Sequence, residues 1–134
     1  MTRTFLAILI LGFGIMLITR PVLAHHSEAA EYDPNKPVKV TGTIKKVEWQ
    51  NPHVWFYVDV KEENGTITTW GFSGAPPSFL MRQGIPRDAM KVGDMVKVDG
   101  FRARDGSNNA SGGRVTFADG RSVFTASPED VRPD

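Results

Sequence analysis

The chain of 134 residues contains no cysteine. Without cysteine it cannot form disulfide bonds, cannot hold a metal ion through thiolates, and cannot be anchored to a membrane through a lipidated cysteine. Its stability must therefore come from its core alone. Any bound metal ion would need nitrogen, oxygen or methionine sulfur ligands. The length suits one domain of ordinary size.

The sequence also lacks an excess of charge of one sign, because it contains 16 Lys and Arg residues and 15 Asp and Glu residues. A nucleic-acid-binding protein needs a basic stripe that displaces counterions from phosphates, so this balance argues against such a partner. The sequence has no glycine-rich phosphate loop before a helix and no Gly-x-Ser-x-Gly nucleophile motif. Nothing in the spacing groups Ser, His and acidic residues, so the sequence does not predict an enzyme.

The one long hydrophobic run lies at the N-terminus. Arg3 precedes a continuous apolar stretch from Phe5 to Ile18, and the small residues Val22 and Ala24 follow it. A membrane-spanning helix needs roughly 20 apolar residues, which this run does not reach. The pattern predicts a cleaved signal peptide over residues 1–24, hence a periplasmic or secreted protein with no membrane span after cleavage.

Cleavage after Ala24 would leave 110 of the 134 residues and would remove two arginines but no acidic residue, so the formal net charge would fall from +1 to −1. Residues 25–37 have no hydrophobic period and predict an extended N-terminal arm, with one helical turn near 27–32. Residues 127–134 are charged and contain proline, which predicts a disordered tail. Residues 38–126 are the predicted folded domain.

Alternating apolar residues predict a series of strands in this domain. In the first strand Val38, Val40 and Ile44 share one parity and Val47 has the other, which predicts a β-bulge near Lys45-Lys46. Two prolines before Ser78 and a glycine at position 84 predict a short helix, and residues 105–113 predict a polar loop. The predicted strands are Val38–Trp49, Val54–Lys61, Thr66–Phe72, Met95–Ala103, Arg114–Phe117 and Arg121–Thr125, and the predicted helix is Ser78–Gln83.

This order predicts an all-β fold. Three strands, a short helix between the third and fourth strands, and a closing set of strands suit a five-stranded OB-like barrel. A plain meander barrel and a small sandwich are the competing predictions.

The sequence resembles a DUF6152-type family of small exported bacterial proteins of unknown function. The resemblance covers nearly all of the predicted mature chain. It implies a periplasmic protein of Gram-negative type and brings no activity, substrate or ligand with it. The stretches that carry it are Ala24-His25-His26-Ser27, Ala30-Glu31-Tyr32-Asp33, Val40-Thr41-Gly42-Thr43, Glu48-Trp49-Gln50-Asn51-Pro52-His53-Val54, Val92-Gly93-Asp94 and Gly100-Phe101-Arg102-Ala103.

The chain has three histidines, His25, His26 and His53, and cleavage after Ala24 would place the first at the mature N-terminus. There the α-amine, whose pKa is ordinarily about 8, and the ring Nδ1 can chelate one metal ion. A second imidazole from His53 would complete a three-nitrogen histidine brace. Alternatively, the α-amine, the intervening amide nitrogen and the His26 ring would bind the metal ion without help from the fold. Copper is the candidate cofactor, because copper(II) tops the divalent affinity order at such ligands.

Two other interpretations of the histidines stay open. In the first, His25 and His26 are only a hydrophilic, cleavage-compatible start to the arm, and His53 hydrogen-bonds the loop before it. A copper oxidase or oxygenase is the remotest prediction, since no substrate surface can be argued.

The alternative to metal binding is a non-metal binding module. Trp55, Tyr57 and Trp70 lie on the second and third predicted strands, whose face binds ligands in OB folds. Exposed aromatic rings there would contact a saccharide or a partner protein in the periplasm. The competing interpretation, favoured for Trp70, is that the tryptophans fill the barrel and its ends. The sequence therefore predicts a small exported binding protein.

Overall fold

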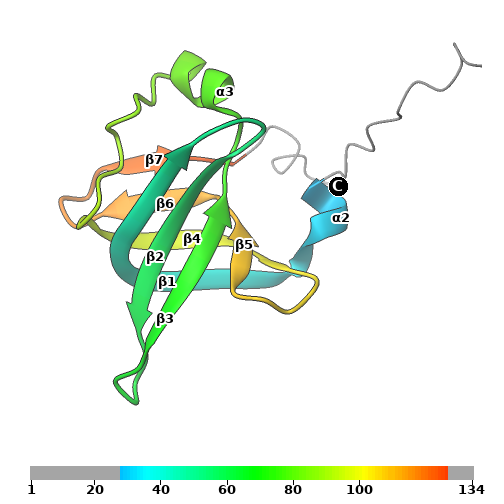
Figure 1. The fold of residues 1–134 in the computed structure, drawn as a ribbon, viewed down its shortest axis with the longest axis vertical. Coiled ribbons are helices and arrows are strands. Elements are labelled where there is room, and N and C mark those ends of the chain that lie inside the picture. The colour runs from blue at the N-terminus through cyan, green and yellow to red at the C-terminus, as the bar shows by residue number, and fades with distance from the viewer. Residues whose placement is uncertain (1–27, 127–134) are drawn as a thin grey trace, which may run out of the picture.

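The computed structural model describes residues 28–126 (Figure 1). The predicted signal peptide, His25, His26 and the predicted tail at 127–134 lie outside these described residues. Strands dominate, which confirms the all-β class. The elements are α2 (Glu28–Glu31), β1 (Tyr32–Trp49), β2 (Val54–Lys61), β3 (Ile67–Ser73), α3 (Pro77–Arg82), β4 (Met95–Ala103), β5 (Asn109–Ser111), β6 (Arg114–Phe117) and β7 (Ser122–Phe124).

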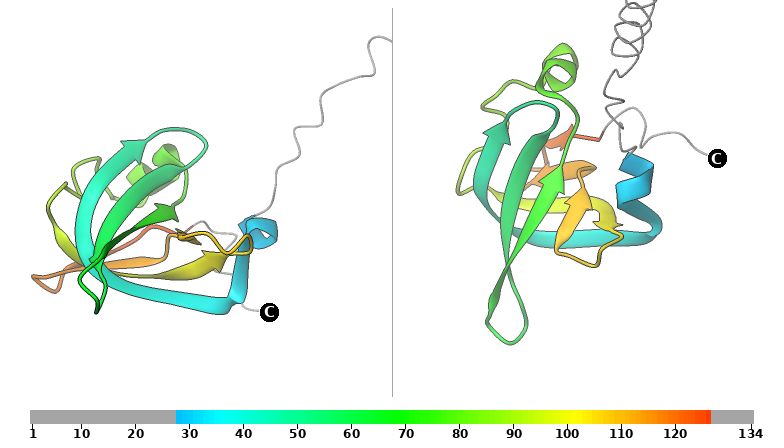
Figure 2. Two further views of the ribbon diagram at one scale, coloured as in Figure 1. Left: turned by 60° about the horizontal axis from the view of Figure 1, so that its bottom comes forward. Right: turned by 45° about the vertical axis from the view of Figure 1, so that its right-hand side comes forward.

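Five of the strands form a closed ring of hydrogen-bonded neighbours. β1 pairs antiparallel with both β2 and β4, and β3 lies between β2 and β5. β5 runs parallel to β3 and antiparallel to β4, which closes the ring in the order β1-β2-β3-β5-β4. The β6–β7 hairpin extends the sheet from β4, as the two views in Figure 2 show.

The length and curvature of β1 allow it to pair with two different strands. Its first part pairs with β4 up to Thr43, and its second part pairs with β2 from Thr43 onwards. The register shifts between Ile44 and Lys46, which confirms the predicted bulge. At Gly42, a Cβ atom would lie 2.2 Å from the carbonyl oxygen of Asp59. Only glycine therefore fits where the strand bends closely over β2.

Two predicted boundaries are wrong. The first strand begins at Tyr32 instead of Val38, because Tyr32 pairs with Ala103 and Pro37 pairs with Phe101 of β4. The predicted polar loop at 105–113 contains β5, whose Ala110 is fully buried opposite Phe72. Both segments lack hydrophobic alternation, so their strand conformation comes from pairing with distant strands.

The core lies inside the ring and continues beneath α3. Phe56 and Phe72 are fully buried and stack with ring centroids 5.2 Å apart. At the end of the ring where β2 begins, at the top of Figure 1, Leu80 of α3 packs against Val54 and Ile85. The helix lies within one residue of its predicted bounds. None of the helices within residues 28–126 is long and apolar enough to cross a membrane.

Candidate functional site

His53 lies in the short connection between β1 and β2, after a cis Asn51–Pro52 peptide bond. Its side chain is half-buried, and its Nδ1–H donates a hydrogen bond to the carbonyl oxygen of Gly74 at 2.9 Å. Assigning the proton to Nδ1 follows from this acceptor, since a carbonyl cannot donate. In that neutral tautomer Nε2 carries the lone pair, so Nε2 is the nitrogen that His53 would offer to a metal ion.

The carbonyl that orients His53 is itself fixed by the fold. Gly74 directly follows β3, and its amide donates to the carbonyl of Val54 at 2.7 Å. The next amide, from Ala75, donates to the carbonyl of Thr125 at 2.8 Å. Val54 of β2 and Thr125, which directly follows β7, thus hold the chain on either side of the carbonyl that accepts the His53 hydrogen bond. This is the contact that metal-bound histidines commonly make with their second ring nitrogen.

The described residues do not complete a metal site around His53. Within residues 28–126, no group of three His, Asp or Glu side chains lies close enough together to hold a metal ion. His25 and His26, the other predicted ligands, precede Glu28 and lie outside the described part of the chain. A metal site at His53 made of such side chains would therefore need ligands from outside residues 28–126.

Trp55 and Tyr57 of β2 lie together on the outer face of the ring, because they alternate with the buried Val54, Phe56 and Val58. Their ring centroids are 6.3 Å apart and their planes differ by 21°. Both rings lie near Gly71 of β3: a Cβ atom there would lie 3.4 Å from Tyr57 Cε1 and 3.5 Å from Trp55 Cζ3. Its nearest neighbour would be Oδ1 of Asn109, at 2.6 Å. We call Trp55, Tyr57 and Gly71 the aromatic platform.

Trp70, the third aromatic residue predicted for this face, lies on the opposite face of the sheet. It is paired with the buried Val58, packs against the core, and has its ring centroid 6.4 Å from that of Phe72. The guanidinium of Arg102 covers it at 5.5 Å from the ring centroid. Trp70 thus helps fill the ring, as the competing interpretation predicted, and the three aromatic residues do not form one surface.

A charged pair borders the aromatic platform on β1. The Glu48 carboxylate pairs with Lys46 at 2.5 Å and accepts a hydrogen bond from the Tyr57 hydroxyl at 3.0 Å. The hydrogen bond from Lys46, followed by that from Tyr57, holds the pKa of Glu48 below its ordinary value. Burial, followed by the Glu48 contact, raises the pKa of Tyr57. An ionised carboxylate therefore lies beside the two rings at neutral pH.

Sequence reasoning missed this role of Glu48, although a signal for it was present. The predicted bulge reverses the parity of β1, so residues after it change face. Counting from the bulge places Glu48 opposite Trp55, as the observed register has it. Glu48 therefore belongs to the same outer face as the platform.

Comparison with known proteins gives one finding about the family. The model of a family of unknown function, DUF6152, matches residues 14–113, which is most of the chain and agrees with the resemblance seen in the sequence. No curated protein and no solved structure matches the chain. The function must therefore be argued from this chain's own residues.

Proposed function

We propose that this chain, which belongs to the DUF6152 family, is an exported periplasmic binding protein built on an OB-like barrel, and that it binds copper(II) through its mature N-terminus. The OB-like assignment is supported by the ring order β1-β2-β3-β5-β4, with β3 parallel to β5 and α3 between β3 and β4. OB folds are five-stranded, partly open barrels that bind ligands on strands two and three and in their loops. The export assignment rests on the N-terminal sequence pattern.

The observation that carries the copper proposal is the hydrogen bond from His53 Nδ1–H to the Gly74 carbonyl. It supports a preoriented imidazole whose Nε2 would be the metal ligand. Cleavage after Ala24 would supply the α-amine and ring of His25 as the other ligands. Three nitrogens of this kind favour copper(II) over zinc and nickel. The alternative set, made by the amine, the intervening amide and the His26 ring, does not use His53.

The test is copper(II) titration of protein processed in the periplasm, followed by electron paramagnetic resonance. A three-nitrogen signal is expected, and it should be lost when one extra residue precedes His25. His53→Ala should alter the signal and weaken binding. Asn51→Ala, an exposed change in the same connection, is the matched control and should alter neither. A signal unchanged by His53→Ala but lost on N-terminal extension would assign binding to the His26 mode. Equal weak binding in all variants would reject the copper proposal.

A second candidate function, binding of a saccharide or a partner protein, is favoured by the aromatic platform. The half-buried rings offer apolar surface, and the Glu48 carboxylate and the Asn109 amide oxygen beside them are hydrogen-bond acceptors. Tyrosine and tryptophan supply such contact area at low entropic cost.

The platform is tested by measuring binding to a panel of bacterial saccharides and to periplasmic proteins with Trp55→Ala and Tyr57→Ala. Each variant should lose binding that the wild type shows. Ile67→Ala, at an exposed position on β3, is the control and should retain it. Unchanged binding in both platform variants counts against this candidate.

A further inference from the structure

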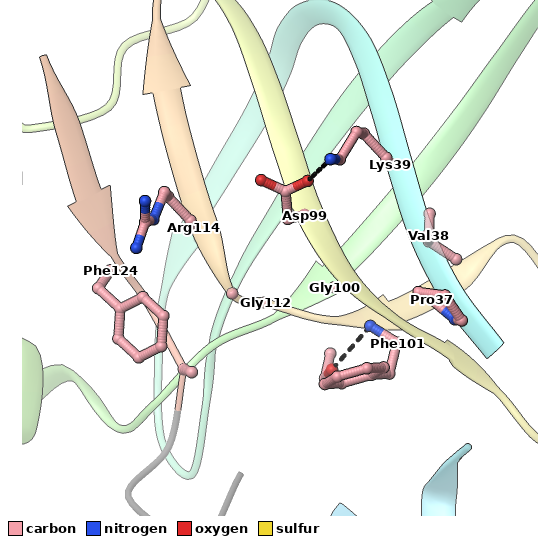
Figure 3. Close-up of a pocket in the computed structure, with 12 residues that line it drawn as sticks. Pro37, Val38, Lys39, Asp99, Gly100, Phe101, Gly112, Arg114 and Phe124 are labelled. Atoms are coloured by element: carbon pink, nitrogen blue, oxygen red, sulfur yellow. Dashed lines mark hydrogen bonds and ion pairs between the residues drawn. The ribbon is translucent and has the colours of Figure 1, made fainter. Parts of the chain in front are cut away.

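A hollow of about 590 Å³ lies on the outer surface of the sheet, where the early part of β1, β4, β6 and β7 meet. Figure 3 shows Phe124 and Arg114 at one side and Phe101 with Pro37 at the other. Gly100 and the Gly112-Gly113 pair separate them. We call this hollow the glycine groove. Neither the copper proposal nor the platform proposal uses it.

Three glycines, Gly100, Gly112 and Gly113, line the glycine groove where neighbouring strands approach closely. A Cβ atom at Gly100 would lie 2.0 Å from the carbonyl oxygen of Ser111, and one at Gly113 would lie 2.4 Å from the carbonyl oxygen of Asp99. Glycine is therefore required at both positions by strand packing. These glycines contribute no side chain to the space between the two phenylalanines.

The walls of the groove are apolar and exposed. Phe124 is 49% exposed although it is a large hydrophobic residue. Phe101 is half-buried, and its amide is already satisfied by Ser111 Oγ at 3.1 Å. Exposed aromatic surface around a concave space is typical of ligand sites, which span roughly 300–1,000 Å³. The walls thus favour an apolar body as the occupant.

The charged side chains of the groove determine which charge the occupant should carry. Lys39 and Asp99 neutralise each other through an ion pair of 3.3 Å. Arg114 is exposed, and none of the ion pairs within residues 28–126 joins it to a carboxylate. The uncompensated charge in the groove is therefore a guanidinium, which binds carboxylates through two parallel hydrogen bonds.

We propose that the glycine groove binds a small amphipathic carboxylate, with its apolar body between Phe101 and Phe124 and its carboxylate on Arg114. This site is independent of the copper site, because it shares no residue with it. A chain or ring system of modest size fits the space between the two phenylalanines, and the guanidinium lies at the side of the groove formed by β6 and β7 (Figure 3).

The experiment is a fluorescence titration of the full mature protein with cis-parinaric acid, a fluorescent fatty acid, and with its methyl ester. Saturable binding of the acid is expected. The ester should bind about 10- to 100-fold more weakly, as loss of a charge-assisted contact predicts. Arg114→Gln should weaken acid binding by a similar factor and leave ester binding unchanged. Arg82→Gln, on the exposed end of α3, is the matched control and should bind as the wild type does.

Two further variants keep the test decisive. Phe124→Ala should weaken the acid and the ester equally, because it removes only apolar contact. Arg114→Lys keeps the charge but not the paired geometry, so its affinity should fall between those of Arg114→Gln and the wild type. Thermal unfolding of each variant, expected to match the wild type because both side chains are exposed, checks that the fold is retained. If Arg114→Gln does not fold, Arg114→Lys and the ester carry the test.

The proposal is overturned by three results. The first is the absence of saturable binding of the acid. The second is equal affinity for acid and ester. The third is tighter binding of the acid after truncation behind Ala126, because the acidic segment with Glu129 and Asp130 would then be the natural occupant of the groove.

Discussion

The hydroxyl of Tyr57 on β2 donates a hydrogen bond to the carboxylate of Glu48 on β1, with 3.0 Å between the two oxygen atoms. The same carboxylate pairs with Lys46, whose ammonium lies 5.7 Å from the centroid of the Tyr57 ring. The bulge between Ile44 and Lys46 makes this arrangement, because it turns Lys46 and Glu48 onto the face that carries Tyr57. A local irregularity of one strand thereby fixes the border of the aromatic platform.

This relationship predicts acid-sensitive stability. Lys46, and then Tyr57, depress the pKa of Glu48 below 4.5, its ordinary value. A depressed pKa adds stability above the unfolded value, and this stability is lost as the pH falls through the folded value. The melting temperature of the wild type should exceed that of Glu48→Gln near neutral pH, and the difference should shrink as the pH falls below 4.5 and through the lower folded-state pKa. Glu63→Gln in the exposed β2–β3 turn is the control, and a difference independent of pH contradicts the prediction.

Gly42→Ala should destabilise the fold. Its Cβ atom would lie 2.2 Å from the Asp59 carbonyl oxygen and 2.9 Å from Val58 Cγ1, so backbone must move. Overpacking of this kind costs about 1–3 kcal/mol, which lowers the melting temperature of a domain of this size by roughly 4–8 °C per kcal/mol. Calorimetry of Gly42→Ala, with a variant at the exposed Thr41 (Thr41→Ala) as the control, measures this drop in melting temperature. Equal melting temperatures for the two variants would refute the close approach.

Phe72→Ala should be among the most damaging single changes. The side chain is fully buried, stacks on Phe56 at 5.2 Å, and its removal leaves a cavity in the centre of the ring. The expected loss is about 3–5 kcal/mol of unfolding free energy in urea titration. Ile67→Ala, 59% exposed on the same strand, should change the free energy by less than about 0.5 kcal/mol. Similar losses for both would mean that the core is elsewhere.

Arg102→Ala should loosen the packing around Trp70. The guanidinium donates to the carbonyls of Gly106 at 2.8 Å and Ser107 at 3.1 Å while it covers the Trp70 ring. Losing these contacts should cost about 1–2 kcal/mol. Acrylamide should then quench tryptophan fluorescence more strongly. Arg82→Ala is the matched exposed control, and unchanged quenching in Arg102→Ala would contradict the placement of Arg102.

Local periodicity explains why much of the fold could be predicted. Side chains alternate at period two along a strand. The spacing of Val54, Phe56 and Val58 therefore predicts both β2 and its buried face. The same rule exposed the bulge, because a slip of one residue reverses every later side chain. The position of His53 at the start of β2 followed from its proline turn. Its bond to Gly74 did not, because the two residues are brought together by the pairing of β2 with β3.

The faces of the aromatic residues were only partly predictable. Parity placed Trp55 and Tyr57 opposite the buried valines, but whether that face lies outward depends on which side of the sheet the ring encloses. Trp70 and Phe72 are two residues apart, so their side chains lie on the same face of β3, and the observed core shows that this face points into the ring. The glycine groove could not be predicted at all, because it requires knowing which strands cross at Gly100 and Gly113.

Local sequence patterns were enough to predict the all-β class, most strand positions, the bulge and α3, because each of these depends on side chains close together in the chain. The start of β1 at Tyr32, and the strand conformation of the polar segment Asn109–Ser111 in β5, were not predictable from such patterns. Both segments have weak local preferences, and their conformation is set by hydrogen bonds to distant strands: Tyr32 lies opposite Ala103, and Ala110 lies between Phe72 and Arg102. The closure of the ring, and with it the location of every candidate site, therefore depends on long-range pairing.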